Sequence, residues 1–276
     1  MSVWPRENRE MNNPIIRWLA KSVRWFTGRG GYLLLTTDDQ RLSLTPTKRF
    51  TWAWLEVFVL SLLWGVLMIG LWGWAWRSFG DEVAWLLPPT LTMAASLLLM
   101  YRLAAVRTAE LIATEAAHRP LLISVGVAVA TAGLMALKPQ LYRQEYSLPD
   151  WISWVRPMAK NYRVLLLMPL WGAWAMMIVG QFCHCRDRTE PAVAAFVKAC
   201  GPLMAAGGLA AVLSLSIFYF HFLPYTHLGI SGAAIAAAIA GGLLLSRRSG
   251  GLTRSSLLAA NLVTQLAFLL AYLACQ

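Results

Sequence analysis

Seven long runs of apolar residues constrain the fold of this chain more than any other feature. A hydrocarbon layer about 30 Å thick is crossed by roughly 20 residues of helix, with about 17 as the lower limit. Seven stretches reach or approach that length: Trp54–Trp76, Val83–Leu103, Pro120–Leu137, Val164–Phe182, Gly201–Leu223, Leu228–Leu245 and Leu257–Ala274. We therefore predict an all-α fold, a polytopic membrane helix bundle with about seven transmembrane helices.

Composition and the placement of tryptophan support the same prediction. Of the 276 residues, 58% are hydrophobic and 13% are charged, whereas a soluble domain has roughly 25% charged residues. One soluble core cannot bury so much apolar surface. Trp54 and Trp74 are twenty residues apart near the two ends of the first run, which corresponds to about 30 Å of helix. Tryptophan favours both membrane–water interfaces, so this spacing matches a membrane crossing.

The chain divides into a basic extension, residues 1–50, and a membrane domain, residues 51–276. The extension has nine Lys and Arg and four acidic residues, and it lacks the apolar core of a secretory signal peptide. By the positive-inside rule, we expect a cytoplasmic N-terminus in the inner membrane and, after seven crossings, a C-terminus outside. The basic loops at 102–119, 183–198 and 247–254 agree with this orientation. The 138–163 loop, expected outside, carries five basic residues, so its side stays open.

Two local structures are predicted within the extension. Residues 13–27 place apolar and basic side chains on different faces of a helix, which predicts an interfacial amphipathic helix on anionic lipid headgroups. Apolar residues on both sides of the polar segment 36–40 predict a small hairpin over residues 32–44. The net charge of +11 is accounted for by cytoplasmic flanks, so we expect no nucleic-acid partner.

None of the predicted spans carries an ionisable residue near its middle. Ion-coupled transporters and proton pumps place such residues inside the bundle, so this absence disfavours those classes. Asn261, Thr264 and Gln265 form a polar face on the last span, for which we favour interhelical hydrogen bonds over a ligand site. The sixth span is rich in Gly and Ala between Gly229 and Gly242, which predicts a position at the centre of the bundle.

Cysteine and histidine spacing does not predict a metal site. Cys183 and Cys185 have one residue between them, whereas zinc-binding pairs are separated by two to four. We interpret these thiols and Cys200 as reduced structural groups. His221 and His227 flank a turn, so they are interpreted as interface residues rather than haem ligands, and whether the protein has a cofactor stays unknown.

The segment between the sixth and seventh spans is the best candidate for a binding site. Its paired glycines permit a tight backbone, the following helix N-terminus offers N–H groups, and three arginines add positive charge. The candidate residues for binding a phosphate or lipid headgroup are Arg247, Arg248, Gly250, Gly251, Thr253 and Arg254. The alternative is that these arginines only orient the chain in the membrane.

The same segment matches a known C-terminal motif, GG-x-TGD-x-LGA, without gaps. The matching residues are Gly250, Gly251, Thr253, Leu257 and Ala259. Over about thirty residues the chain thereby resembles adenosylcobinamide-GDP ribazoletransferase, the membrane-embedded cobalamin synthase. The family's acidic positions are missing: its motif Asp falls on Ser255, and two acids in the helix fall on Leu262 and Gln265.

Two functions stay open, and so does whether the protein is an enzyme. The favoured one is a non-catalytic subunit or scaffold of a membrane complex, with the lipid bilayer and other membrane proteins as partners, because acidic residues are scarce. The alternative implied by the resemblance is a cobalamin-synthase-like transferase acting on a phosphorylated or nucleotide-linked substrate at the cytoplasmic face. Its metal would need carboxylates. The candidates are Glu110, Glu115, Asp187 and Glu190.

Membrane topology provides the first test. Reporter domains fused after residue 50 and at residue 276 are expected on opposite sides of the membrane, because seven spans invert the chain. Measuring alkaline phosphatase and fluorescent-protein activities of the two fusions decides the matter. Activity on the same side for both would mean that one predicted span, with Pro120–Leu137 as the leading candidate, does not cross.

Overall fold

The computed structural model of the chain describes residues 30–37, 46–83, 86–137, 160–183, 190–220 and 224–275. Within these ranges the secondary structure is helical, without strands. Seven helical segments are long and apolar enough to cross a membrane: Ala53–Phe79, Leu87–Ile112, Ala116–Ala136, Tyr162–Phe182, Pro191–Tyr219, Thr226–Arg248 and Arg254–Ala274. Each overlaps one predicted span, which confirms the predicted fold class of an all-α polytopic bundle.

Some spans consist of more than one helical element. The single-helix spans are α4 (Ala53–Val83), α8 (Lys160–Phe182) and α12 (Arg254–Ala274). The fifth span, α9 (Pro191–Phe220), consists of two helical parts joined by a kink at Gly201, whose φ is 57°. The second span comprises α5 (Leu87–Ser96), the π-helical turn η3 (Leu97–Tyr101) and α6 (Arg102–Ile112). The third comprises η4 (Ala116–His118) and α7 (Arg119–Ala136). The sixth comprises α10 (Pro224–Ala236), the π-helical turn η6 (Ala237–Gly241) and α11 (Gly242–Arg248).

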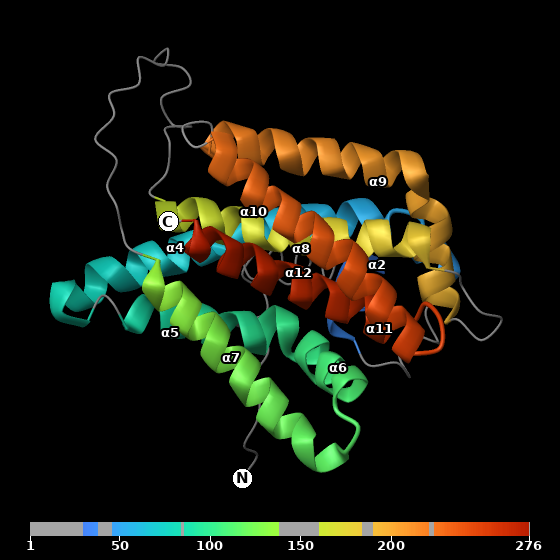
Figure 1. Ribbon diagram of the computed structural model, residues 1–276, viewed down its shortest axis with the longest axis horizontal. Helices are drawn as coiled ribbons and strands as arrows, with labels where there is room; N and C mark the ends of the chain where they lie inside the picture. Colours follow the sequence, from blue (N-terminus) through green and yellow to red (C-terminus); the bar gives the residue numbers. More distant parts are fainter. Residues whose placement is uncertain are drawn as a thin grey trace, which may run out of the picture.

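Helix α8 lies at the centre of the bundle. In an 18-residue stretch of its span, 83% of the residues are buried inside the protein. The corresponding share is 33% for the sixth span and 11% for the α7 span. Helix α8 packs against α4, α9 and α12, and Figure 1 shows α9 on one side of the α8–α12 pair, with α6 and α7 on the other. The prediction that the sixth span is central was wrong. Small residues permit a close approach on one side of a helix, but a central helix needs apolar side chains around its whole circumference.

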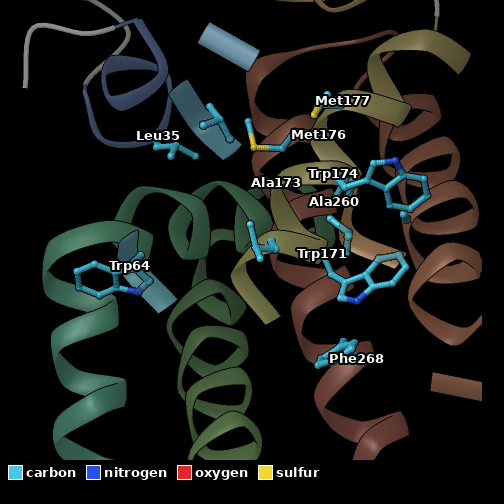
Figure 2. Close-up of a cluster of buried hydrophobic side chains, with 14 of the residues drawn as sticks. Leu35, Trp64, Trp171, Ala173, Trp174, Met176, Met177, Ala260 and Phe268 are labelled. Carbon is cyan, nitrogen blue, oxygen red and sulfur yellow. The ribbon is translucent and has the colours of Figure 1, made fainter. Parts of the chain in front are cut away.

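The core around α8 is aromatic. The ring of Trp171 lies edge-on to that of Trp174 with centroids 5.6 Å apart, and it stacks on Phe268 of α12 at 6.3 Å. Figure 2 shows Trp171, Trp174 and Phe268 close together, with Ala260 of α12 beside them. Both indole N–H groups donate to α9, from Trp174 to the Ala205 carbonyl and from Trp171 to the Ser216 hydroxyl. Aromatic packing and interhelical hydrogen bonds thus join three spans.

Glycines allow α8 to approach its neighbours closely. A Cβ atom added to Gly65 of α4 would lie 3.0 Å from the Cα atom of Leu166, so two helix backbones meet there. On α8 itself, a Cβ on Gly172 would lie 2.7 Å from the Gln265 amide nitrogen and 2.8 Å from the Asn261 amide oxygen. The absence of a side chain at position 172 therefore makes room for the polar face of α12.

A short helix, α2 (Gly30–Thr36), stands where the first strand of a hairpin was predicted. That prediction was wrong for residues 32–36. Leu34 and Leu35 are buried against the membrane helices, and a helix satisfies its own backbone hydrogen bonds in such surroundings, whereas a strand needs a partner. The predicted second strand and the predicted amphipathic helix at 13–27 lie outside the described residues. A 3₁₀ turn, η2 (Thr47–Phe50), leads into α4.

The packing at Gly172 makes a prediction about stability. Gly172→Ala is expected to lower the free energy of unfolding by about 1–3 kcal/mol, because the new methyl group overlaps the two amide side chains of α12. Gly70→Ala is the matched control, since nothing lies within 4 Å of a Cβ at that position of α4. Unfolding in detergent with increasing denaturant measures both variants. Equal stability of the two would contradict the close approach.

Candidate functional site

The two glycines of the predicted binding loop form the C-terminal cap of α11. Gly250 has a φ of 73° and its N–H donates to the Arg247 carbonyl at 3.1 Å, while the Gly251 N–H donates to the Ser246 carbonyl at 2.8 Å. These two bonds make a Schellman motif, which requires a left-handed residue at the position of Gly250. Both N–H groups therefore bond within the chain rather than facing an open phosphate cradle.

The N-terminus of α12 is capped as well. The Thr253 hydroxyl accepts a hydrogen bond from the Ser256 N–H at 3.2 Å, and the Ser256 hydroxyl accepts one from the Thr253 N–H at 3.0 Å. This reciprocal arrangement is a capping box. It uses one of the free N–H groups that an anion at this helix end would need.

Arg254 is buried and holds the end of α2. Its side chain is 1% exposed, its Nε donates to the Leu34 carbonyl at 2.7 Å, and one terminal nitrogen donates to the Leu33 carbonyl at 3.0 Å. At the other end of α2, the Gly31 N–H donates to the Glu56 carboxylate at 2.8 Å. A carboxylate at the helix N-terminus and a guanidinium at its C-terminus match the helix dipole. We call this arrangement the α2 clamp.

The remaining arginines of the predicted site are exposed. Arg247 and Arg248 lie on the surface, and Arg248 approaches the Ile112 carbonyl at the end of α6, at 3.5 Å. The six predicted residues therefore do not converge on one pocket. Gly250, Gly251 and Thr253 cap helices, Arg254 supports α2, and two arginines face outward.

Two of the carboxylates named for a metal-dependent reaction lie beside basic side chains. Glu110 pairs with Arg107 at 2.9 Å and with Arg119 at 3.8 Å, and Glu115 lies 3.7 Å from the His118 ring. Asp187 lies outside the described residues. Among the residues that the structure describes, no group of three His, Cys, Asp or Glu side chains is placed to hold a metal ion.

The thiols that can be placed are free, and two of them are buried. The Cys183 sulfur lies 3.0 Å from the Ser246 hydroxyl, Cys200 is buried in α9, and Cys275 is exposed. The rest of the Cys183–Cys185 cluster lies outside the described ranges.

A different site emerges inside the bundle. A cavity of about 250 Å³ lies between the second, third and seventh spans, and Met68 of α4 and Met168 of α8 also contribute to its wall. All of its lining residues belong to the membrane-spanning segments, and most are apolar. The wall formed by α7 belongs to the span that is least buried in the protein, so this helix separates the cavity from the surroundings of the bundle. We call this space the membrane cavity.

Four polar side chains line the membrane cavity. The Ser96 hydroxyl donates to the Thr92 carbonyl, the Thr108 hydroxyl donates to the Ala104 carbonyl, and the Gln265 amide donates to the Asn261 side chain. The fourth is Tyr101, which is 6% exposed and whose hydroxyl is buried next to the Gln265 side chain.

The π-helical turn η3 shapes the wall that carries Tyr101. Residues four apart along this span line the cavity: Met93, Leu97, Tyr101, Ala105 and Ala109. In an α-helix, positions four apart drift around the axis by about 40° per step, so such a row would leave the cavity face. A π turn has more residues per turn and offsets part of that drift, and π turns occur frequently at functional sites.

The sequence prediction missed Tyr101 because it ended the second span at Leu103. Tyrosine near a span end is typical of the membrane interface, so the residue had no special meaning there. In the structure the helical segment continues to Ile112, so Tyr101 lies within it rather than at its end. Gln265, in contrast, belonged to the predicted polar face of the last span.

Comparisons with protein-family models, with curated proteins and with solved structures found no match for this chain. The membrane cavity and the α2 clamp are therefore interpreted from their geometry alone.

The α2 clamp makes a prediction about Arg254. Arg254→Gln is expected to loosen α2, because each hydrogen bond from a charged donor contributes about 1.5–3 kcal/mol. Leu35→Cys, placed in a chain whose four native cysteines are replaced, reports the change through faster reaction with a membrane-permeant maleimide. Arg248→Gln is the control, since that side chain is exposed, and it should leave the labelling rate unchanged. Equal rates in both variants would show that Arg254 does not hold α2.

Proposed function

We propose that this multi-pass membrane protein is non-catalytic and binds the apolar part of a membrane-resident molecule in the membrane cavity. The observation that carries the proposal is a space of about 250 Å³ at membrane depth, lined by side chains such as Leu122, Ile123 and Leu266. Binding pockets are typically concave, largely apolar and supplied with a few polar groups. The membrane cavity has these properties.

Energetics favour an occupant. Side chains that line a space of about 250 Å³ lack contact partners on the side that faces it, so they forfeit part of their dispersion attraction. Hydrocarbon chains surround a membrane protein at high concentration. An apolar molecule entering beside α7 would therefore recover dispersion contacts that the empty wall lacks.

The α2 end of the bundle supports a further role as a subunit of a membrane complex. The α2 clamp fixes the extension to the first and last spans, so a partner bound by residues 1–29 would be tied to the bundle. Arg247 and Arg248 are exposed at this end, and we propose that they meet anionic headgroups of the lipid bilayer on its cytoplasmic side. The cobalamin-synthase-like transferase stays a prediction from the resemblance.

Filling the membrane cavity tests the proposed function. Gly126 of α7 lines the cavity, and nothing lies within 4 Å of a Cβ there, so Gly126→Phe places a ring in the space. A diazirine-labelled hexadecane in nanodiscs should crosslink wild-type residues 93–109 and 122–134, and Gly126→Phe should abolish most of this labelling. Peptide mass spectrometry measures the crosslinks.

Gly70→Phe is the matched control for this experiment. Gly70 is exposed on α4 and does not line the cavity, so the same ring is added to the outer surface. Labelling of the cavity peptides should persist in that variant. Equal labelling in Gly126→Phe and wild type would show that the probe reacts from the lipid side and would contradict binding in the cavity.

A further inference from the structure

We propose that the membrane cavity holds one acyl chain of an anionic phospholipid, whose phosphate is bound at one end of the cavity by Arg119 and Arg248. This inference rests on the proposed function, because it names the molecule whose apolar part occupies the cavity. Two adjacent features of the structure carry it: a long apolar space, and a group of arginines at the end of that space.

Arg119 continues the face of α7 that lines the cavity. Residues three or four positions apart share one face of a helix. The cavity-lining residues of α7 follow this spacing: Leu122, Ile123, Gly126, Val127, Ala130 and Leu134. Arg119, the first residue of α7, precedes Leu122 by three positions and Ile123 by four. Its side chain therefore belongs to the same face, at the N-terminal end of the cavity wall.

Arg248 lies at the same end of the cavity, although it belongs to α11. Its Nη1 atom approaches the carbonyl oxygen of Ile112 at 3.5 Å, and Ile112 is both the last residue of α6 and part of the cavity lining. Figure 1 shows the ends of α6 and α11 side by side. Arg119 reaches the same end of α6, because its Nη1 atom lies 3.8 Å from the Glu110 carboxylate. Two helices that are remote in sequence thus bring two arginines to one end of the cavity.

The charge at this end of the cavity favours an anion. Between residues 107 and 119 and in α11, four arginines stand against two glutamates, which leaves a net charge of +2. Glu110 is paired more closely with Arg107, at 2.9 Å, than with Arg119. The Arg119 side chain is 44% exposed and Arg248 is exposed as well, so a headgroup can reach both. Guanidinium groups bind phosphate through charge-assisted hydrogen bonds, often two at a time.

The cavity has the dimensions of one lipid chain. Its lining on α7 runs from Leu122 to Leu134, which is about 18 Å of helix. One leaflet of hydrocarbon is about 15 Å thick, half of a core of about 30 Å. An engineered cavity of about 150 Å³ holds one benzene ring. A space of about 250 Å³ therefore admits one chain of a phospholipid but not both. The second chain would lie in the bilayer, against exposed residues of α7 such as Val125 and Val129.

The combination of the two features selects the class of ligand. A hydrocarbon or a neutral lipid would gain nothing from positive charge at one end of the cavity. A soluble phosphate compound would leave the apolar walls without contacts. An anionic phospholipid gains charge-assisted hydrogen bonds at the arginines and dispersion contacts along the cavity, so it uses both features.

Paired lipid probes that differ in headgroup charge test the proposal. Phosphatidylglycerol and phosphatidylcholine, each with the same diazirine-labelled chain, are added to the full chain in nanodiscs of neutral lipid. In wild type, residues 93–109 and 122–134 should be labelled more by the phosphatidylglycerol probe. Arg119→Gln/Arg248→Gln should lower this labelling about five-fold for each arginine removed. The phosphatidylcholine probe should label both proteins equally. Peptide mass spectrometry measures the crosslinks.

Two control variants accompany the double variant. Arg77→Gln/Lys198→Gln removes the same number of positive charges from exposed side chains outside the cavity lining, and it should keep the preference for phosphatidylglycerol. Arg119→Lys/Arg248→Lys retains both charges and should keep more of the preference than the glutamine variant. The diazirine-labelled hexadecane has no headgroup, so it should label all of these proteins equally and verify an intact cavity. If the glutamine double variant loses hexadecane labelling, the single variants Arg119→Gln and Arg248→Gln decide by the same comparison.

The outcomes separate this inference from the proposed function. If wild type shows no preference for phosphatidylglycerol, or if the arginine variant keeps that preference, the headgroup is not bound at this end and the inference fails. The cavity then remains a binding site as long as Gly126→Phe blocks hexadecane labelling. An equal loss of preference in Arg77→Gln/Lys198→Gln would assign the effect to the overall charge of the protein and would also overturn the inference. If Gly126→Phe does not block hexadecane labelling, the proposed function itself fails.

Discussion

Backbone hydrogen bonds must be satisfied within the chain wherever hydrocarbon replaces water, and the architecture of this bundle depends on that constraint. A helix pairs the backbone N–H and C=O groups of its interior residues with each other, so the groups that lack partners are those at its two ends. Two buried arginines serve such ends: Arg254 donates to the last carbonyls of α2, and Arg163, at the start of α8, donates to the Tyr219 carbonyl near the end of α9. Charged side chains are costly inside a membrane protein, yet here each one offsets part of its desolvation by completing a helix terminus.

The same constraint explains which features were predictable. Length and hydropathy are properties of a continuous segment, so all seven spans could be located from the sequence. Tertiary contacts decide where each helix sits and where it stops. The small residues of the sixth span indicated close packing but not centrality, whereas the position of α8 depends on how its aromatic residues meet α9 and α12. The α2 helix was mistaken for a strand because its burial by membrane helices is invisible locally.

The binding loop illustrates a different limit. Its residue types were compatible with an anion site, and the same types serve equally well as helix caps. Which role they play depends on partners that are remote in sequence: Arg254 bonds to a carbonyl 220 positions earlier. Likewise, the membrane cavity exists only because three spans diverge around it, so no single segment contains its pattern. Gln265 was recognised as part of a polar face, but its proximity to Tyr101 required the assembled bundle.

The polar face of α12 and helix α2 each support an element that lines the cavity. Asn261 bonds to the Met176 sulfur and to Gln265, which fixes the amide whose other side faces the cavity. Gly172 leaves the space for this pair, so the centre of the bundle sets the position of a cavity residue. On the other side, α2 packs against η3 and α6, the elements that carry Tyr101. The N-terminal extension and the cavity therefore share a structural wall, and displacement of α2 would remove support from the helix that presents the tyrosine.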